Sequence, residues 1–153
     1  MPLSIRNRQR ALRLDTPAVR RLVGLILDDH GVEDSDLTVV FARDPFVKEL
    51  NAAYRDTDRA TDVLAFAMRD GDPPGIEGNP EELERVLGDV IISVDRAIAQ
   101  AQRYRRTPER EIMKLVSHGV LHLLGYDHDC SKDRTKMRRL ENKYVRALAK
   151  KTR

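Results

Sequence analysis

The segment Val86–Val94, VLGDVIISV, decides the fold because its apolar and polar side chains alternate with the period of a β-strand. One face carries apolar residues and the other polar ones: Val90, Ile92 and Val94 against Asp89 and Ser93. Such a strand buries one face and leaves the other available for a polar site. A helix is expected directly after it, over about residues 95–104.

The elements around this strand alternate in type. Runs rich in β-branched or apolar residues predict strands at 3–7, 37–41 and 63–68. Helical spacing predicts four further helices. Three of them start at a capping residue followed by proline: Thr16 and Pro17, Asp44 and Pro45, and Thr107 and Pro108. Ser131 is a possible cap for the fourth. The expected order is therefore β-α-β-α-β-β-α-α-α.

This order predicts an α/β (α+β) fold, a single mixed β-sheet of about four strands packed with about five helices. The 153 residues suffice for one domain over 1–153. Asp70–Pro80 is dense in Gly and Pro, which favours a long surface loop. The apolar runs are far shorter than the roughly 20 residues of a membrane-spanning helix. The arginine-rich start and the single cysteine, Cys130, favour a cytoplasmic location.

Charge is distributed unevenly although the net charge is only +3. Residues 1–27 carry six basic and one acidic side chain, residues 28–100 seven and eighteen, and residues 101–153 fifteen and six. Basic ends that meet in space would form a positive face of the kind that binds nucleic-acid phosphates. Composition alone is equally compatible with an ordinary solvated surface, so the motifs have to decide.

Ser117–His128, SHGVLHLLGYDH, holds three of the four histidines. His118 and His122 are four residues apart on an expected helix, so both imidazoles can ligate one metal ion. Gly125 can end the helix in a left-handed conformation and let His128 turn back towards them. Three histidine ligands leave positions open for water or substrate, as in catalytic zinc sites.

The same spacing, H-x3-H-x5-H, occurs in metzincin proteases. Those enzymes place a glutamate directly after the first histidine as general base, and here that position is Gly119. Glu111 is about two helical turns from His118, too far to replace it. A metallopeptidase is therefore disfavoured, and no general base is assigned.

The run from His118 to His128 resembles the hallmark H-G-x-L-H-L-x-G-Y-D-H of the YbeY family of bacterial rRNA maturation factors, which are metal-dependent endoribonucleases. Leu50–Phe66, LNAAYRDTDRATDVLAF, and Leu87–Ser93, LGDVIIS, resemble two further family segments. Weaker agreement continues through Met137 and Glu141. Ala60 and Ala65 stand where the family usually has Pro and Ser, and neither is a proposed ligand.

The resemblance implies one Zn²⁺, or another divalent transition metal, on His118, His122 and His128. It also implies a catalytic role for His118 and for Arg55, with Arg55 binding an RNA phosphate. Arg55 has an alternative interpretation as a helix-end residue beside a dipole or carboxylate. Asp127 could hydrogen-bond a ligand or only cap the turn, and Cys130 could pack or coordinate the ion.

The implied activity is single-strand-specific cleavage of RNA in 16S rRNA 3′-end maturation and ribosome quality control. The implied partners are rRNA, the small ribosomal subunit, ribosomal proteins and the GTPase Era, with no role for DNA or membranes. The basic C-terminal helix suits RNA phosphates, whereas three Phe, four Tyr and no Trp predict no aromatic stacking platform. An alternative is a ribosome-assembly or RNA-binding factor whose metal is structural.

Overall fold

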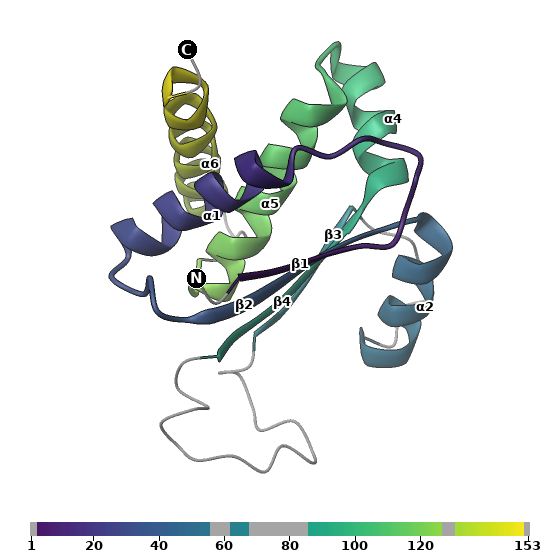
Figure 1. Cartoon of the computed structure of the whole chain (residues 1–153), viewed down its shortest axis with the longest axis horizontal. Coiled ribbons are helices and arrows are strands. Elements are labelled where there is room, and N and C mark those ends of the chain that lie inside the picture. Colours follow the sequence, from purple (N-terminus) through teal and green to yellow (C-terminus); the bar gives the residue numbers. More distant parts are fainter. Residues whose placement is uncertain (1–2, 56–61, 68–85, 127–130, 152–153) are drawn as a thin grey trace.

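The computed structural model of the chain describes residues 3–55, 62–67, 86–126 and 131–151 (Figure 1). Its elements follow the predicted order: β1 (Leu3–Asn7), α1 (Thr16–Asp29), β2 (Asp36–Ala42), α2 (Asp44–Arg55), β3 (Val63–Ala67), β4 (Val86–Ser93), α4 (Val94–Tyr104), α5 (Pro108–Leu123) and α6 (Ser131–Lys151). The predicted loop Asp70–Pro80 lies outside the described residues.

The four strands form one mixed sheet in the order β1-β2-β4-β3. β2 pairs in parallel with β1 and β4, whereas β3 is antiparallel to β4. β4 is therefore an inner strand. Val90 and Ile92 are fully buried, while Asp89 on the opposite face is exposed. The predicted α/β class with a mixed sheet is confirmed.

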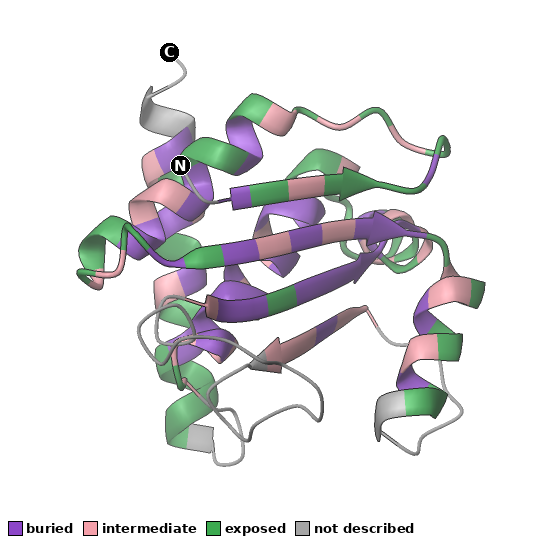
Figure 2. Ribbon diagram, turned by 60° about the horizontal axis from the view of Figure 1, so that its bottom comes forward, coloured by how far each residue is buried: buried purple, intermediate pink, exposed green. Residues whose placement is uncertain are grey.

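Helices cover the two faces of the sheet unequally. α5 packs against β3 and β4, and α1, α4 and α6 pack around α5 on the same side. α2 lies on the other side and packs against β4 (Figure 1). Figure 2 shows the consequence, because burial is concentrated on the inner strands β2 and β4 and on the helix surfaces that meet them. The main core therefore lies between the sheet and α1 and α5.

Helix starts differ from the prediction by one residue in two places. Asp15, rather than Thr16, caps α1, because its carboxylate accepts a hydrogen bond of 3.0 Å from the backbone N–H of Ala18. Ser93 caps α4 in the same way by accepting from Arg96 N–H, so this helix starts at residue 94. Ser93 is also completely buried, and its hydroxyl donates to Asp44. Its expected place on an open polar face is therefore wrong.

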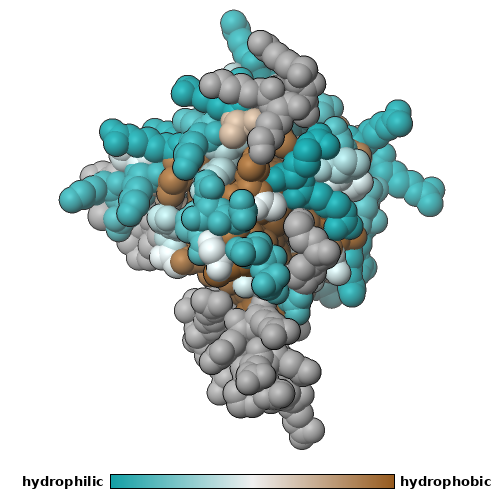
Figure 3. Space-filling model, turned by 60° about the vertical axis from the view of Figure 1, so that its left-hand side comes forward, coloured by the Kyte–Doolittle hydropathy of each residue, from teal (hydrophilic) through white to brown (hydrophobic). Residues whose placement is uncertain are grey.

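Helical spacing predicts an apolar stripe of Met137, Leu140, Tyr144 and Leu148 on α6. The structure confirms it, because Leu140 is partly buried against the core and the other three are buried. Ser131 is the first helical residue, and the position before it lies outside the described part. Hydrophilic side chains project around the face seen in Figure 3, with hydrophobic residues visible between them. Among the described residues, no helix is both long and apolar enough to span a bilayer.

Candidate active site

α5 carries two of the predicted ligands, and its sequence determines where it starts and ends. Thr107 caps the first turn by accepting a hydrogen bond from Arg110 N–H at 3.2 Å, and Pro108 occupies the first helical position. At the other end Gly125 has φ +101°, and the N–H of Tyr126 returns to the carbonyl of Leu121 at 3.1 Å. The predicted left-handed turn after α5 is confirmed.

Gly119 brings α5 close to the sheet. A Cβ atom at this position would lie 2.5 Å from Cγ1 of Val90 and 3.2 Å from Cγ2 of Val63. Only glycine therefore permits this approach, because neither neighbour is the far end of a flexible chain. The glutamate that a peptidase of this spacing needs has no room here. Packing, as well as sequence, disfavours the peptidase alternative.

His118 and His122 lie on the flank of α5, next to its buried face, and both are partly exposed. Their ring centroids are 6.1 Å apart with an interplanar angle of 82°. Successive turns of the helix therefore present two imidazoles on one side, as the spacing predicts. Such a pair can provide two nitrogen donors for one ion.

Glu141 of α6 holds the His118 ring. Its Oε1 lies 3.3 Å from Nδ1 of His118, and the Glu141 side chain is only 7% exposed. The hydrogen bond that His118 donates to Glu141 raises the pKa of His118, and burial of the ring opposes this shift. Because Nδ1–H donates to the carboxylate, the lone pair of the neutral imidazole lies on Nε2. This is the arrangement in which a carboxylate orients a metal-ligating histidine.

Asp62 adds a second carboxylate near His118. Its Oδ1 accepts from Val63 N–H at 2.8 Å and its Oδ2 from Gln100 Nε2 at 3.1 Å. These bonds attach the start of β3 to α4. The negative charge of Asp62 also contributes to the raised pKa of His118.

A cavity of about 460 Å³ lies beside His118, between α4, α5 and α6. Its polar lining comes from all three helices and the start of β3: Asp62, Gln100, Tyr104, Arg106, Glu111, Lys114, His118, Arg138, Glu141 and Asn142. Glu111 is buried and pairs with Arg106 at 3.0 Å. Glu111 is therefore held by an arginine, which agrees with assigning Glu111 no role as a general base.

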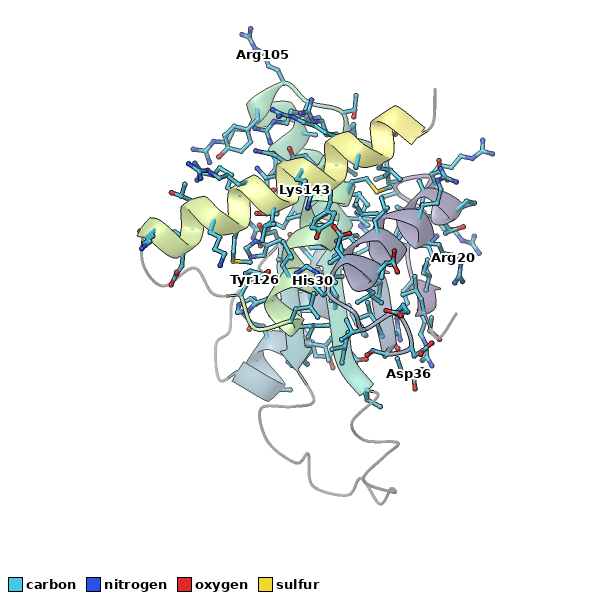
Figure 4. All side chains as sticks on the ribbon, turned by 90° about the vertical axis from the view of Figure 1, so that its left-hand side faces the viewer. Arg20, His30, Asp36, Arg105, Tyr126 and Lys143 are labelled. Atoms are coloured by element: carbon cyan, nitrogen blue, oxygen red, sulfur yellow. The ribbon has the colours of Figure 1, made fainter. Side chains whose placement is uncertain are left out.

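His30 and Tyr126 hold the segment that follows α5. His30 Nδ1 lies 2.7 Å from the carbonyl oxygen of Ile26, and Nε2 lies 3.0 Å from the hydroxyl of Tyr126. Figure 4 shows the two labelled side chains together, where the end of α1 meets the turn after α5. Tyr126 precedes His128 by two residues. The contact therefore fixes the chain just before the third predicted ligand.

A second groove, of about 510 Å³, lies on the face of the sheet that carries α2. Asp89 lies in it between the neighbouring strand residues Thr38 and Phe66, with Arg6 also lining the groove. Burial raises the pKa of Asp89, and the positive charge of Arg6 acts against it. The polar face predicted for β4 is thus present at Asp89, on the side of the sheet away from α5.

The structure places some predicted site residues and not others. His118 and His122 are described and lie side by side. His128, Asp127 and Cys130 lie outside the described residues, as does the side chain of Arg55 at the end of α2. Within the described part, no group of three His, Cys, Asp or Glu side chains could hold a metal ion. The assignment of His128 and Arg55 therefore stays a prediction.

Glu141 is the contact to His118 that sequence reasoning did not assign. The signal for it was available, because Glu141 falls within the stripe of α6 formed by Met137, Tyr144 and Leu148. A carboxylate inside an apolar stripe is rarely left without a partner. The partner itself could not be identified, since it belongs to another helix.

Comparison with known proteins gives consistent matches. A family model described as endoribonuclease YbeY matches residues 4–149. Two proteins named endoribonuclease YbeY are similar to this chain. The one from Pelotomaculum thermopropionicum is 40% identical, and the alignment covers 97% of each chain. The one from Heliobacterium modesticaldum is 45% identical, and the alignment covers 76% of this chain and 72% of the relative. A solution structure from Thermotoga maritima aligns with TM-score 0.62 and 27% identity, over 95% of this chain and 88% of that one.

Proposed function

The chain belongs to the endoribonuclease YbeY family, and from this premise we propose that it is a metal-dependent hydrolase that cleaves single-stranded RNA. Its proposed role is maturation of the 16S rRNA 3′ end and quality control of the small ribosomal subunit. The observation that carries the proposal is the imidazole pair on α5, with Nδ1 of His118 held by the buried Glu141.

The donor set fits a divalent transition metal, with zinc as the expected ion. His118 and His122 offer nitrogens from one side of α5, and Glu141 on Nδ1 leaves the lone pair of His118 on Nε2. With His128 as third ligand, these residues would hold the ion. The chemistry that such an ion supplies when bound is polarisation of a phosphoryl oxygen and activation of water near neutral pH.

The protein's own side chains would position both the ligands and the RNA. Glu141 keeps a proton on Nδ1 of His118 and so fixes the tautomer and the orientation of the ring. Arg55 would pair with the scissile phosphate, because a guanidinium offers two parallel N–H donors and stabilises charge developing on oxygen. His30 and Tyr126 keep the chain before His128 in place.

The distribution of charge favours RNA as the substrate. Along α6 the exposed basic residues are Lys132, Arg134, Lys136, Arg138, Arg139, Lys143 and Arg146. Such a series contacts backbone phosphates independently of sequence. Selection of a particular rRNA site would then depend on the ribosomal context, with ribosomal proteins and Era as the proposed partners.

The proposal is tested by metal content together with cleavage of a single-stranded rRNA 3′ fragment. We expect about one equivalent of metal in the unmodified protein, and loss of cleavage in His118→Ala and Arg55→Glu. Arg21→Glu is the control for the second variant, because Arg21 is an exposed arginine on α1 and its reversal changes the net charge equally. Cleavage that survives His118→Ala would contradict the proposal.

A second outcome would favour the assembly-factor alternative. A full equivalent of metal with no cleavage by the unmodified protein, alone or with small subunits added, would indicate that the metal is structural. A structural metal site normally has four protein ligands, and Cys130 would be the candidate for the fourth. If a variant lacking Cys130 still binds the metal, its thiol is not that fourth ligand.

A further inference from the structure

Tyr104 is an unusual surface residue. It is the one large hydrophobic side chain that is exposed among the described residues, with 53% of its surface accessible. The guanidinium carbons of Arg103 and Arg106 lie 5.5 and 5.4 Å from its ring centroid. An exposed aromatic ring beside arginines is the combination on which unpaired nucleic-acid bases stack. The composition predicts no aromatic stacking platform, but composition cannot tell that Tyr104 is exposed beside two arginines.

The end of α4 fixes this ring at the edge of the cavity next to His118. Arg105 adopts a left-handed conformation with φ +55°, and Arg106 N–H returns to the carbonyl of Ala101 at 2.8 Å. This is the hydrogen bond of a Schellman motif, which ends the helix and turns the chain sharply. Tyr104 is the last residue before that turn, and it lines the same cavity as His118.

Two basic side chains of the cavity lining are not engaged by its carboxylates. Each of its three carboxylates already has a partner: Glu111 binds Arg106, Glu141 binds His118, and Asp62 accepts from Gln100 and Val63. Lys114 of α5 and Arg138 of α6 also line the cavity, and neither is bonded to another described residue. Lys114 and Arg138 are thus the two cations of the lining that can contact an anionic ligand.

We propose that the cavity between α4, α5 and α6 is a subsite for single-stranded RNA, in which an unpaired base stacks on Tyr104 and a neighbouring phosphate contacts Arg138 and Lys114. The inference rests on the proposed function, because RNA that is cleaved at His118 would extend from there into this subsite. A volume of about 460 Å³ accommodates a single nucleotide unit and lies within the usual range for small-ligand sites. A duplex keeps its bases stacked on one another and offers none to Tyr104.

The test measures binding of a fluorescent single-stranded RNA dodecamer by anisotropy, with the protein as isolated and again with EDTA to stop cleavage. Replacing a stacking aromatic by alanine weakens binding by about 5- to 150-fold. We expect an increase of this size in Kd for Tyr104→Ala and little change for Tyr104→Phe, which retains the ring. The matching duplex should bind less tightly and be insensitive to both substitutions.

Arg138 has a matched control in Arg21, which is exposed on α1, does not line the cavity and is not part of the basic series of α6. Arg138→Gln should lower the slope of log affinity against log salt by about 0.7, the value for one phosphate contact on a single strand. Arg21→Gln removes the same charge and should leave the slope close to that of the unmodified protein. Equal slopes for the two variants would overturn the phosphate contact.

The result separates this subsite from the proposed catalytic activity. If His118→Ala abolishes cleavage but Tyr104→Ala binds and cleaves as well as the unmodified protein, the subsite is wrong and the proposed function stands. If no variant or condition gives cleavage but Kd still depends on Tyr104 and Arg138, the subsite stands and the proposed function fails. Folding of each variant is checked by its thermal unfolding, so loss of structure is not mistaken for loss of binding.

Discussion

Two histidines join the helices on the same side of the sheet, and their partners differ in charge. His118 on α5 donates from Nδ1 to the buried carboxylate of Glu141, which raises the pKa of the ring. His30 at the end of α1 contacts neutral groups with both nitrogens, the Ile26 carbonyl at Nδ1 and the Tyr126 hydroxyl at Nε2. One ring therefore has a charged partner and the other has two neutral ones.

The difference explains which histidine suits chemistry. With Glu141 on one nitrogen, His118 has the orientation and the basicity that a metal ligand needs. His30 uses both nitrogens to connect α1 with the turn after α5, so it acts as a structural link. The same residue type thus serves two purposes, and the group opposite each nitrogen decides between them.

The largest expected effect comes from disturbing the helix that carries His118. Gly119→Ala places a Cβ atom against Val90, and overpacking of this kind costs about 1–3 kcal/mol of unfolding free energy. In Val90→Ala protein the same change should cost clearly less, because the Val90 methyls are gone and only the Val63 methyl at 3.2 Å remains close. Denaturant unfolding of the four proteins in this cycle measures the coupling. A stabilisation by Gly119→Ala, as expected at an open helix position, would contradict the close packing.

The next largest effect is expected when the charged partner of His118 is removed. Glu141→Gln keeps the size of the side chain but not its charge, so the pKa of His118 should fall. Loss of such a partner typically weakens metal binding by about 10- to 100-fold. Chelator competition measures the affinity, and the NMR titration of the ring protons in metal-free protein measures the pKa. An unchanged pKa of His118 in this variant would show that Glu141 does not control the ring.

The same contact predicts a dependence of stability on pH in the metal-free protein. Because the folded-state pKa of His118 is raised above 6.5, its pairing with Glu141 stabilises fully below pH 6.5 and is lost as pH rises through the folded-state pKa. Hydrogen bonds to charged groups contribute about 1.5–3 kcal/mol. The difference in unfolding free energy between unmodified protein and Glu141→Gln, measured from pH 5.5 to 9, should therefore shrink as pH increases. A constant difference would contradict this coupling.

Much of the fold could be predicted because its signals are local. The alternation in β4, the cap and proline before α5, and the stripe of α6 each depend on residues close in sequence. The order of the strands was not predicted, since β2 pairs with β4 across a long separation that no local pattern records. The cap of α1 was misplaced by one residue because Asp15 and Thr16 are both good cap residues.

The candidate site divides in the same way. The spacing of His118 and His122 predicts their shared side of α5, because both lie on one helix. Glu141 and Tyr104 depend on how α6 and α4 pack against α5, and that is a tertiary relation. The role of His30 was missed for the same reason: its partner Tyr126 is 96 residues away in the sequence. A dipole interaction at the end of α1 was the only feature visible locally.

The smallest expected effect is at His30, the histidine with two neutral partners. Tyr126→Phe removes the hydroxyl that contacts His30 Nε2 and should cost about 0.5–1.5 kcal/mol of unfolding free energy, the usual net value of a neutral hydrogen bond. Unlike Glu141→Gln, it should leave the pKa of His118 unchanged, because Tyr126 is not among the groups that shift it. Thermal unfolding and the His118 titration check both parts. A shift in the His118 pKa as large as that in Glu141→Gln would mean that the two histidine contacts act as one network and that their separation is wrong.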